Sequence, residues 1–283
     1  MKRHILGILT LFISLAAFAT GQDGDVIYIN GSEYIDGSKW ELLGKPIYGD
    51  STLSDALEAA LPKDRGCVTS NWSGYTAYWS IVKDKLYLDN IYCDGSPLPP
   101  ETLRRIFSKY MDGNRIVATW FTGNIRMGKG NLVYYEHSAF NRNYEEEQII
   151  SLSKGKVTDV KVFHNYMKDG LSFDNFRPSI DIQDPKVRNK LFPIHPERYP
   201  DLKGVERIRA IVMDAFVDST GHMVKCKVKA TFERNGQKVE HPAFAAEIEK
   251  MMKAYYPWRV YYINGEFVSH VKGTVIPFRL HHK

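Results

Sequence analysis

Cysteine is scarce in this chain of 283 residues, and the spacings that metal sites need are missing. There are three cysteines, and neither C-x-x-C nor H-x-x-x-H occurs anywhere. Because zinc sites draw their ligands from such closely spaced pairs, we expect no metal site and no cofactor. The catalytic signatures G-x-S-x-G and H-E-x-x-H are absent too. We therefore name no catalytic residue.

A large excess of charge of one sign is also missing. The chain has 38 Lys and Arg against 33 Asp and Glu, a formal net charge of +5, and loss of the first 19 residues would remove Lys2 and Arg3 and leave +3. A nucleic-acid partner needs a clustered basic face, and these charges are scattered along the sequence, so we expect no such partner. With 43% hydrophobic and 25% charged residues, the composition is that of a globular protein.

Long hydrophobic runs are confined to the N-terminus. A basic start at Lys2 and Arg3 precedes a short apolar run from Ile5 to Phe18 and the sequence Ala17-Phe18-Ala19. A basic region, a short apolar region and an A-x-A site are typical of a secretory signal peptide. We expect residues 1–19 to be removed, which leaves no transmembrane segment and places the protein in the periplasm or at the outer membrane. The alternative is an uncleaved anchor, for which the apolar run is short.

The cysteine positions suggest one disulfide in an oxidising compartment. Cys67 and Cys93 bracket a single strand pair, and we expect them to be linked; the alternative is two free buried thiols. Cys226 lies in Val224-Lys225-Cys226-Lys227-Val228-Lys229-Ala230, where alternation puts the sulfur on the face of the valines and the three lysines on the other. We expect this third cysteine to be free and buried.

Alternating apolar residues and turn signals predict a strand-rich domain over residues 20–168. The expected strands are Asp25–Ile29, Ser32–Ile35, Thr76–Val82, Leu86–Ile91, Arg115–Phe121, Leu132–Glu136, Glu147–Leu152 and Lys156–Phe163. Two helices interrupt them, Thr52–Leu61 with Thr52 as its N-cap and Pro100–Tyr110.

The rest of the chain divides into a connection and a second domain. Residues 169–202 contain five prolines without sustained periodicity, which favours a domain connection with extended pieces. Residues 203–283 then follow a strand-strand-helix-strand order. The expected elements are Val205–Val217, Met223–Phe232, Pro242–Tyr255 and Phe267–Leu280.

The second domain carries a series of short motifs in a fixed order. They are Tyr199-Pro200, Phe216-Val217-Asp218-x-x-Gly221-x-x-Val224, Pro257-Trp258, Asn264-Gly265 and Val275-Ile276-Pro277-Phe278-Arg279-Leu280. In this order the region resembles the C-terminal domain of the TonB family, in the version common among Bacteroidetes-type energy transducers. The resemblance implies an antiparallel sheet of about three strands with one helix on one face. The expected fold class is therefore α+β, a strand-rich N-terminal domain followed by a small TonB-like domain.

The resemblance also implies how this domain acts. In the TonB family a partner peptide adds to the final strand at the sheet edge, which here points to Thr274, Ile276 and Phe278 as the partner-strand edge. The alternative is an edge capped by another strand or by a second copy of the protein. Working transducers keep an N-terminal anchor and a long proline-rich spacer, whereas this chain has a signal peptide and a folded domain, so energy transduction stays open. The segment Thr231–Glu240 also reads as an extended hairpin where the family moves quickly to its helix.

Aromatic residues are the most conspicuous chemistry of the N-terminal domain. The motifs Trp72-Ser73-Gly74-Tyr75-Thr76-Ala77-Tyr78-Trp79 and Trp120-Phe121-Thr122-Gly123-Asn124-Ile125-Arg126 loosely resemble those of uncharacterised exported bacterial proteins and imply no activity. Trp and Tyr suit the recognition of glycans, peptides or partners. The binding candidates are Trp72, Tyr75, Trp79, Trp120, Phe121 and Arg126. The alternative is a sheet core, since alternation places one set of these aromatics inside and the other outside.

Two functions remain open from the sequence. The first is an exported, non-enzymatic binding module whose partner is an envelope protein or peptide; a small-molecule or glycan ligand stays undefined. The second is an envelope hydrolase or carbohydrate-processing enzyme with its site in the N-terminal domain. Two facing carboxylates in a cleft would favour the enzyme. We expect the acidic run Glu145-Glu146-Glu147 to be a solvated stretch instead.

Overall fold

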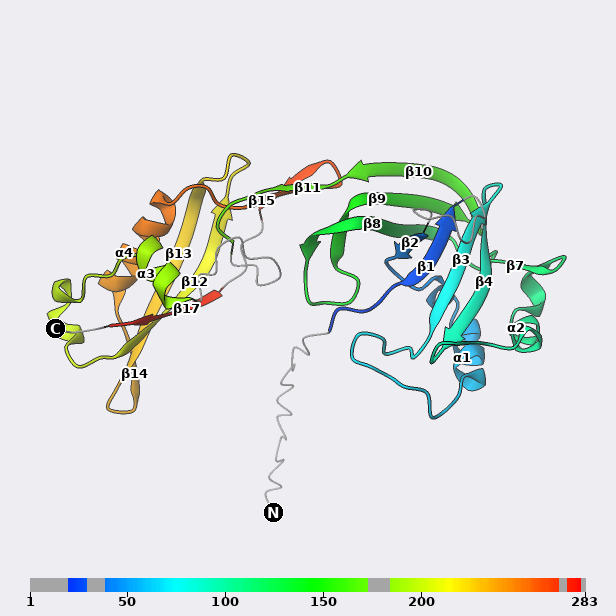
Figure 1. Ribbon diagram of the computed structural model, residues 1–283, viewed down its shortest axis with the longest axis horizontal. Coiled ribbons are helices and arrows are strands. Elements are labelled where there is room, and N and C mark those ends of the chain that lie inside the picture. The colour runs from blue at the N-terminus through cyan, green and yellow to red at the C-terminus, as the bar shows by residue number, and fades with distance from the viewer. Residues whose placement is uncertain (1–19, 30–38, 173–183, 270–273, 281–283) are drawn as a thin grey trace, which may run out of the picture.

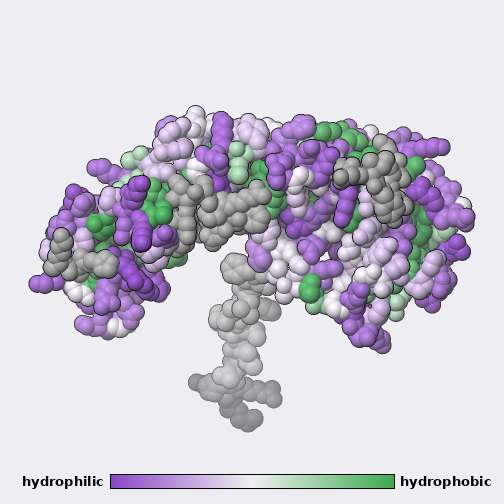
Figure 2. All heavy atoms as spheres, viewed as in Figure 1, coloured by the Kyte–Doolittle hydropathy of each residue, from purple (hydrophilic) through white to green (hydrophobic). Residues whose placement is uncertain are grey.

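A computed structural model describes residues 20–29, 39–172, 184–269 and 274–280, which form two lobes with separate hydrophobic cores (Figure 1). The first core draws on residues from Ile27 to Leu152, and the second on residues from Leu171 to Leu280. Strands dominate both lobes, with four α-helices among the described residues, so the chain is α+β. Figure 2 shows hydrophilic side chains over much of one face of both lobes, with hydrophobic ones in scattered groups.

One sheet that closes on itself forms the N-terminal lobe. Its strand order is β10-β9-β8-β2-β1-β3-β4-β7-β6, with β5 paired to β4. The closure joins β10 to β4, where Lys156 lies opposite Lys85 and the backbone N–H of Leu86 donates to the Gly155 carbonyl at 2.8 Å. The strands are β1 (Asp25–Ile29), β2 (Lys39–Leu42), β3 (Thr76–Val82), β4 (Lys85–Cys93), β5 (Ser96–Pro97), β6 (Met111–Asp112), β7 (Arg115–Val117), β8 (Gly123–Tyr135), β9 (Arg142–Ser153) and β10 (Lys156–His164).

The hairpin expected between Thr76–Val82 and Leu86–Ile91 is confirmed as β3 and β4. Its turn residues Lys83 and Asp84 both have positive φ, 48° and 62°, as a tight two-residue hairpin turn requires. The expected strand Ser32–Ile35 lies outside the described residues. In its place β1 pairs antiparallel with β2 and parallel with β3, and so occupies the centre of the sheet.

Two helices cover the core of this lobe, α1 (Ser51–Ala60) and α2 (Pro100–Ile106). The N-cap of α1 is Asp50, whose carboxylate accepts from the Leu53 N–H at 3.1 Å; the predicted cap, Thr52, lies inside the helix. Asp and Thr are both favoured N-cap residues, so the sequence alone does not choose between them; burial of Leu53 and Leu57 in the first core fixes where the helix begins.

An open four-stranded sheet forms the C-terminal lobe, in the order β14-β13-β12-β17. Its strands are β12 (Arg207–Val217), β13 (Met223–Arg234), β14 (Gln237–Glu240) and β17 (Thr274–Arg279). Helix α4 (Pro242–Ala254) packs on one face and buries Phe244, Ile248 and Met252. The expected extended hairpin at Thr231–Glu240 is present as the pairing of β13 with β14.

A small sheet, β11-β15-β16, corrects two expectations. Its strands are β11 (Tyr166–Lys168), β15 (Val260–Ile263) and β16 (Glu266–Val268). The single strand expected at Phe267–Leu280 is therefore two strands in different sheets, β16 and β17. Strand β11, placed in the N-terminal domain by its sequence position, pairs with β15 of the second lobe. Strand pairing between distant segments leaves no local signal, which is why neither could be predicted.

Residues 184–202 of the proline-rich segment contribute to the second core and form short helical turns; residues 173–183, also expected to belong to the connection, lie outside the described residues. The segment contains helix α3 (Pro185–Leu191) and two short 3-10 turns, Pro196–Arg198 and Pro200–Leu202. Each of these begins at a proline, because the first helical position needs no N–H donor. Phe192 and Leu202 are fully buried here. Within the described residues, no helix is long and apolar enough to span a membrane.

Candidate functional site

The aromatic motif on β3 places most of its residues in the core. Tyr75, Ala77 and Trp79 are 3%, 0% and 0% exposed, whereas Trp72 is 59% exposed. The predicted alternation, with one face in the core and one outside, is confirmed. The binding role expected for Tyr75 and Trp79 is wrong, because a side chain sealed in the core cannot meet a ligand without unfolding of the sheet.

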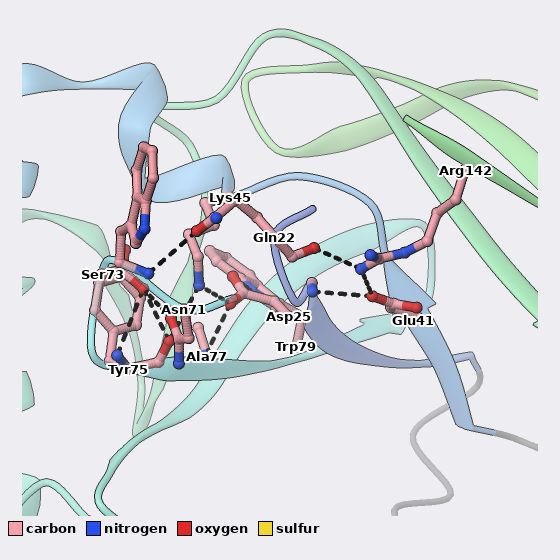
Figure 3. A network of polar contacts seen from close by, with 12 residues as sticks. Gln22, Asp25, Glu41, Lys45, Asn71, Ser73, Tyr75, Ala77, Trp79 and Arg142 are labelled. Atoms are coloured by element: carbon pink, nitrogen blue, oxygen red, sulfur yellow. Dashed lines mark hydrogen bonds and ion pairs between the residues drawn. The ribbon is translucent and has the colours of Figure 1, made fainter. Parts of the chain in front are cut away.

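These inward residues surround a buried carboxylate at the start of β1 (Figure 3). Asp25 is 0% exposed and accepts from the Ala77 N–H and the Trp79 indole N–H, both at 3.0 Å. The Lys45 ammonium lies 2.9 Å from the same carboxylate and also donates to the Tyr75 carbonyl at 3.1 Å. A buried ion pair is tolerated only when further hydrogen bonds satisfy both charges, and the motif supplies them.

The protonation balance of Asp25 fits a structural role. Burial raises the pKa of this carboxyl, while the charge of Lys45 and the bonds from Ala77 and Trp79 lower it; burial is the largest effect, and the pKa stays above its ordinary value. The group has no solvent access, since both Asp25 and Lys45 side chains are at most 4% exposed. It therefore has no route to a substrate.

The motif requires a glycine at position 74. The φ of Gly74 is +64°, and a Cβ there would lie 2.7 Å from Nε of Arg65. The Arg65 side chain runs past this position to Glu58, 2.6 Å away, and donates to the Ser73 carbonyl at 3.3 Å. The glycine thus permits both a left-handed backbone and the close passage of an arginine.

Residues of the second motif, Trp120–Arg126, also serve mainly in packing. Trp120 is partly buried against the first core, in edge contact with Tyr110, and its indole N–H donates to the Pro46 carbonyl at 3.3 Å. Phe121 and Arg126 line a hollow of about 170 Å³ beside Lys45. This hollow brings together only two of the six binding candidates.

The guanidinium of Arg126 is already occupied. It donates to the carbonyls of Arg142 and Phe140 at 2.9 and 2.7 Å and lies 3.8 Å from the Glu147 carboxylate. Glu147 is 0% exposed, so the solvated role expected for this end of the acidic run is wrong. Burial raises the pKa of Glu147, and bonds from Asn143 and the Tyr144 N–H oppose that rise.

A second polar cluster links residues 22–24 and Glu41 to β9 (Figure 3). The Arg142 guanidinium donates to the Gln22 carbonyl at 2.6 Å and to the Glu41 carboxylate. Tyr144 donates its hydroxyl to the same carboxylate, which also accepts from the Gly24 N–H at 2.9 Å. Every carboxylate oxygen of Glu41 is thus engaged, and this cluster holds strands together and leaves no free acid or base.

All three cysteines are free thiols, so the disulfide expected between Cys67 and Cys93 is not formed. Cys67 is exposed and Cys93 is buried. Cys226 is free and buried, as predicted, and its thiol contacts the Met252 sulfur at 3.7 Å. Within the described residues, no group of three or more His, Cys, Asp or Glu is placed to hold a metal ion.

In the C-terminal lobe, β17 lies at the end of the strand order and pairs only with β12 among the described strands. The N–H of Leu280 donates to the Glu206 carbonyl at 2.9 Å and so points toward β12. Because N–H groups alternate along a strand, those of Thr274, Ile276 and Phe278 also point toward β12. Ile276 and Phe278 are buried as well, so these three residues do not form the open edge that was predicted.

The open edge is formed by the residues between them. The N–H groups of Val275 and Arg279 point away from β12, and Pro277 has no N–H at all, which fits its place on the outer side. Val275 is 47% exposed. An added strand would therefore bond to Val275 and Arg279 and to the Pro277 carbonyl.

The face of this sheet opposite α4 carries a set of cations that the sequence analysis did not treat as a site. We call it the basic face. Its cations are Arg207, Arg209, Lys225, Lys227, Lys229, Lys238 and Arg279. The alternation of lysines with buried residues around Cys226 was a local sign of it. The arginines of β12 and β17 join them only through strand pairing.

These features define a class of protein: an α+β chain with a closed, strand-rich lobe and a second lobe whose open sheet, among the described strands, ends at β14 and β17 and has α4 on one face. Comparisons with protein-family models, with curated proteins and with solved structures gave no match to this chain.

Proposed function

We propose that this protein is an exported, non-enzymatic interaction module of the bacterial envelope, and that its C-terminal lobe binds a partner polypeptide by strand addition at β17. The observation that carries the proposal is the outward direction of the Val275 and Arg279 N–H groups at an edge with no second neighbour among the described strands. Main-chain bonds at such an edge supply affinity for an extended peptide.

Two sequence features support the same function. The N-terminal residues are typical of a signal peptide, and the motifs between Tyr199 and Leu280 resemble the TonB family, in which partner strands add at this place. The edge itself is guarded against indiscriminate pairing by Pro277 and by the charge of Arg279. Partner specificity would then come from side chains on the exposed side of the strand, beginning with Val275.

An envelope hydrolase finds less support. Glycoside hydrolysis needs two carboxylates that face a common cleft. Three hollows lined by described residues, of about 520, 280 and 170 Å³, each contain at most one carboxylate. The buried acids Asp25 and Glu147 are both bonded and sealed from solvent.

The test replaces the outward donor of the edge. With the mature chain as bait in envelope extracts, Val275→Pro should abolish capture of the protein that the parent retains, because proline removes an outward N–H. Val275→Thr is the matched control, since it keeps the N–H and changes only the side chain. Both variants should melt within a few degrees of the parent, because Val275 donates no bond to β12.

Two outcomes would contradict the proposal. Undiminished capture by Val275→Pro would place the partner surface elsewhere. N-terminal sequencing of the native protein that begins at Met1, and not near Thr20, would remove the expectation of cleavage on which export as a free protein rests.

A further inference from the structure

The basic face holds most of the excess charge of the whole chain. The same face holds seven cations and three carboxylates, those of Asp214, Glu233 and Glu240. Its net charge is therefore +4, compared with +5 for the full chain. The charges are scattered in sequence and become clustered because four strands present alternate residues to one side. A surface of this kind attracts anions over about a Debye length, roughly 8 Å at physiological salt.

Most of these cations have no partner in the part of the chain that the structure describes. Lys225 pairs with Asp214 at 2.9 Å and Lys229 with Glu240 at 2.5 Å. The other five, Arg207, Arg209, Lys227, Lys238 and Arg279, have no ion pair among the described residues.

Two of them also repel one another. Arg207 lies directly opposite Arg279 in the pairing of β12 with β17. Since the pair Leu280–Glu206 is hydrogen-bonded, the next pair along is the non-hydrogen-bonded kind, in which opposing side chains come closest. Like charges directly opposite destabilise a sheet. A bound anion would relieve that repulsion.

The face is hollowed beside this arginine pair. A cavity of about 520 Å³ is lined by Arg207, Arg209, Thr231, Glu233 and Lys238, together with Phe232 and Gly236. We call it the basic hollow. Arg209 and Thr231 are cross-strand partners, as are Glu233 and Lys238, so three strands contribute to one site. The volume lies within the usual range for small-molecule sites.

We propose that the basic hollow binds a phosphorylated sugar or polyol. Two arginines and a lysine match a phosphate, since guanidinium groups donate paired bonds to its oxygens. Glu233, which is exposed, suits the remainder of such a ligand, because a carboxylate accepts from hydroxyl groups. The phosphate group can belong to a free sugar phosphate or to a lipid headgroup, and the chemistry is shared. This site is separate from the outward N–H groups of the β17 edge.

A second basic hollow in the N-terminal lobe is a weaker candidate and a useful control. It has a volume of about 280 Å³ and contains Lys85, Lys109, Lys154 and Lys156 with Asp112. Its carboxylate is already neutralised by Lys85 at 2.9 Å, and it offers no guanidinium for paired bonds. Its one carboxylate is therefore less available to accept from ligand hydroxyls.

The experiment measures binding of glucose 1-phosphate to the mature chain by calorimetry, with glucose as the uncharged probe. In parallel, sedimentation measures binding to phosphatidylglycerol vesicles against phosphatidylcholine vesicles. The double variant Arg207→Gln/Arg209→Gln should weaken binding of the phosphorylated probe at least tenfold. The control Lys109→Gln/Lys154→Gln removes the same charge from the second hollow and should leave binding unchanged. Raised salt should weaken binding in the parent.

Folding does not confuse the result, because Arg207→Gln relieves like-charge repulsion and should leave the melting temperature unchanged or higher. Loss of glucose 1-phosphate binding in the arginine variant supports a soluble ligand. Loss of phosphatidylglycerol binding alone supports a lipid headgroup with the same phosphate contact. The proposal is overturned if neither phosphorylated probe binds better than its uncharged or zwitterionic counterpart. It is also overturned if the arginine variant binds as well as the parent. Loss of capture in the β17 variants would not bear on this outcome.

Discussion

The two lobes differ in whether their main β-sheet is closed or open. The N-terminal sheet closes through β4 and β10, and its inner face becomes a core that α1 and α2 complete. The C-terminal sheet stays open, with α4 on one face, cations on the other, and β17 at an edge with one neighbour among the described strands. Closure consumes side chains and backbone groups, whereas an open sheet leaves both available.

The two lobes differ in which residues are exposed and so available for binding a ligand or partner. In the closed lobe the conspicuous aromatics Tyr75 and Trp79 serve a buried ion pair and the core, and of that motif only Trp72 is largely exposed. In the open lobe the unconspicuous residues Arg207, Arg209 and Val275 face solvent beside a hollow or an edge. We therefore place partner and ligand contacts in the second lobe.

The largest expected effect tests the buried pair of the closed lobe. Asp25→Asn leaves the Lys45 ammonium buried without its counter-charge, and should lower the free energy of unfolding by about 4 kcal/mol. Urea unfolding of the mature chain measures this loss. Asp23→Asn is the control, because among the described residues the Asp23 carboxylate accepts from the exposed Ser70 hydroxyl at 2.8 Å, and its replacement should cost less than about 1 kcal/mol. Equal effects of the two changes would show that the pair is not structural.

A neighbouring pair in β17 separates the two faces of the open sheet. Ile276→Ala removes a fully buried side chain under α4 and should cost about 3 kcal/mol of unfolding free energy. Val275→Ala, one residue earlier and 47% exposed, should cost under about 0.5 kcal/mol. Chemical denaturation of both variants checks the ratio, and similar losses would mean that the second face is covered.

The thiols report burial through pH. Burial raises the pKa of Cys226 to about 11, and the nearby Glu249 carboxylate adds to the rise while Lys253 opposes it. Because the thiolate is the reactive form, Cys226 should label roughly 100-fold more slowly at pH 8 than an ordinary exposed thiol. Exposed Cys67 is the internal reference.

The raised pKa of Cys226 also predicts how the free energy of unfolding depends on pH. An unfolded cysteine ionises at lower pH, so the contribution of Cys226 is complete below about pH 8.5 and is lost as pH rises toward 11. Cys226→Ala should therefore flatten the decline of unfolding free energy over this window. Rapid labelling of Cys226 in the native state at pH 8 would contradict the burial on which both predictions depend.

The smallest expected effect concerns the exposed aromatic of the closed lobe. Trp72→Ala should change the free energy of unfolding by about 0.5 kcal/mol or less, since the side chain is 59% exposed. Trp79→Ala in the same motif should cost several kcal/mol. Thermal melts of the two variants measure the contrast, and a large loss in Trp72→Ala would return this residue to the core.

Local signals predicted elements well and contacts poorly. The hairpin of β3 and β4, the hairpin of β13 and β14 and helix α4 follow from turn residues and periodicity, which act over a few residues. The split of Phe267–Leu280 into β16 and β17 could not be predicted, because each half matches a strand pattern and only its distant partner distinguishes them. The same is true of β11, in which Tyr166 pairs with Tyr262, 96 positions further along the chain.

For the candidate sites, too, the sequence predicted local alternation but not tertiary packing. The sequence alone determined that Cys226, Val228 and Ala230 share one side of β13, because a strand has a period of two. Val224 was expected on the same side but is 57% exposed, because the register of β13 against β12 shifts near Lys225. The sequence also determined the alternation of Tyr75, Ala77 and Trp79. Only the tertiary structure decided which face of each strand meets a core, since that depends on what packs against it.

The basic face arises from strand pairing and not from the order of charges along the sequence. Net charge and its scatter along the chain are properties of the sequence, and by themselves they indicate no basic patch. Pairing of β12 with β13 and β17, and of β13 with β14, brings Arg207, Arg209, Lys238 and Arg279 to one face, from segments separated by about 30 to 70 residues. Electrostatic fields depend on distance in space and not along the chain. The fold therefore decided where an anion would be attracted.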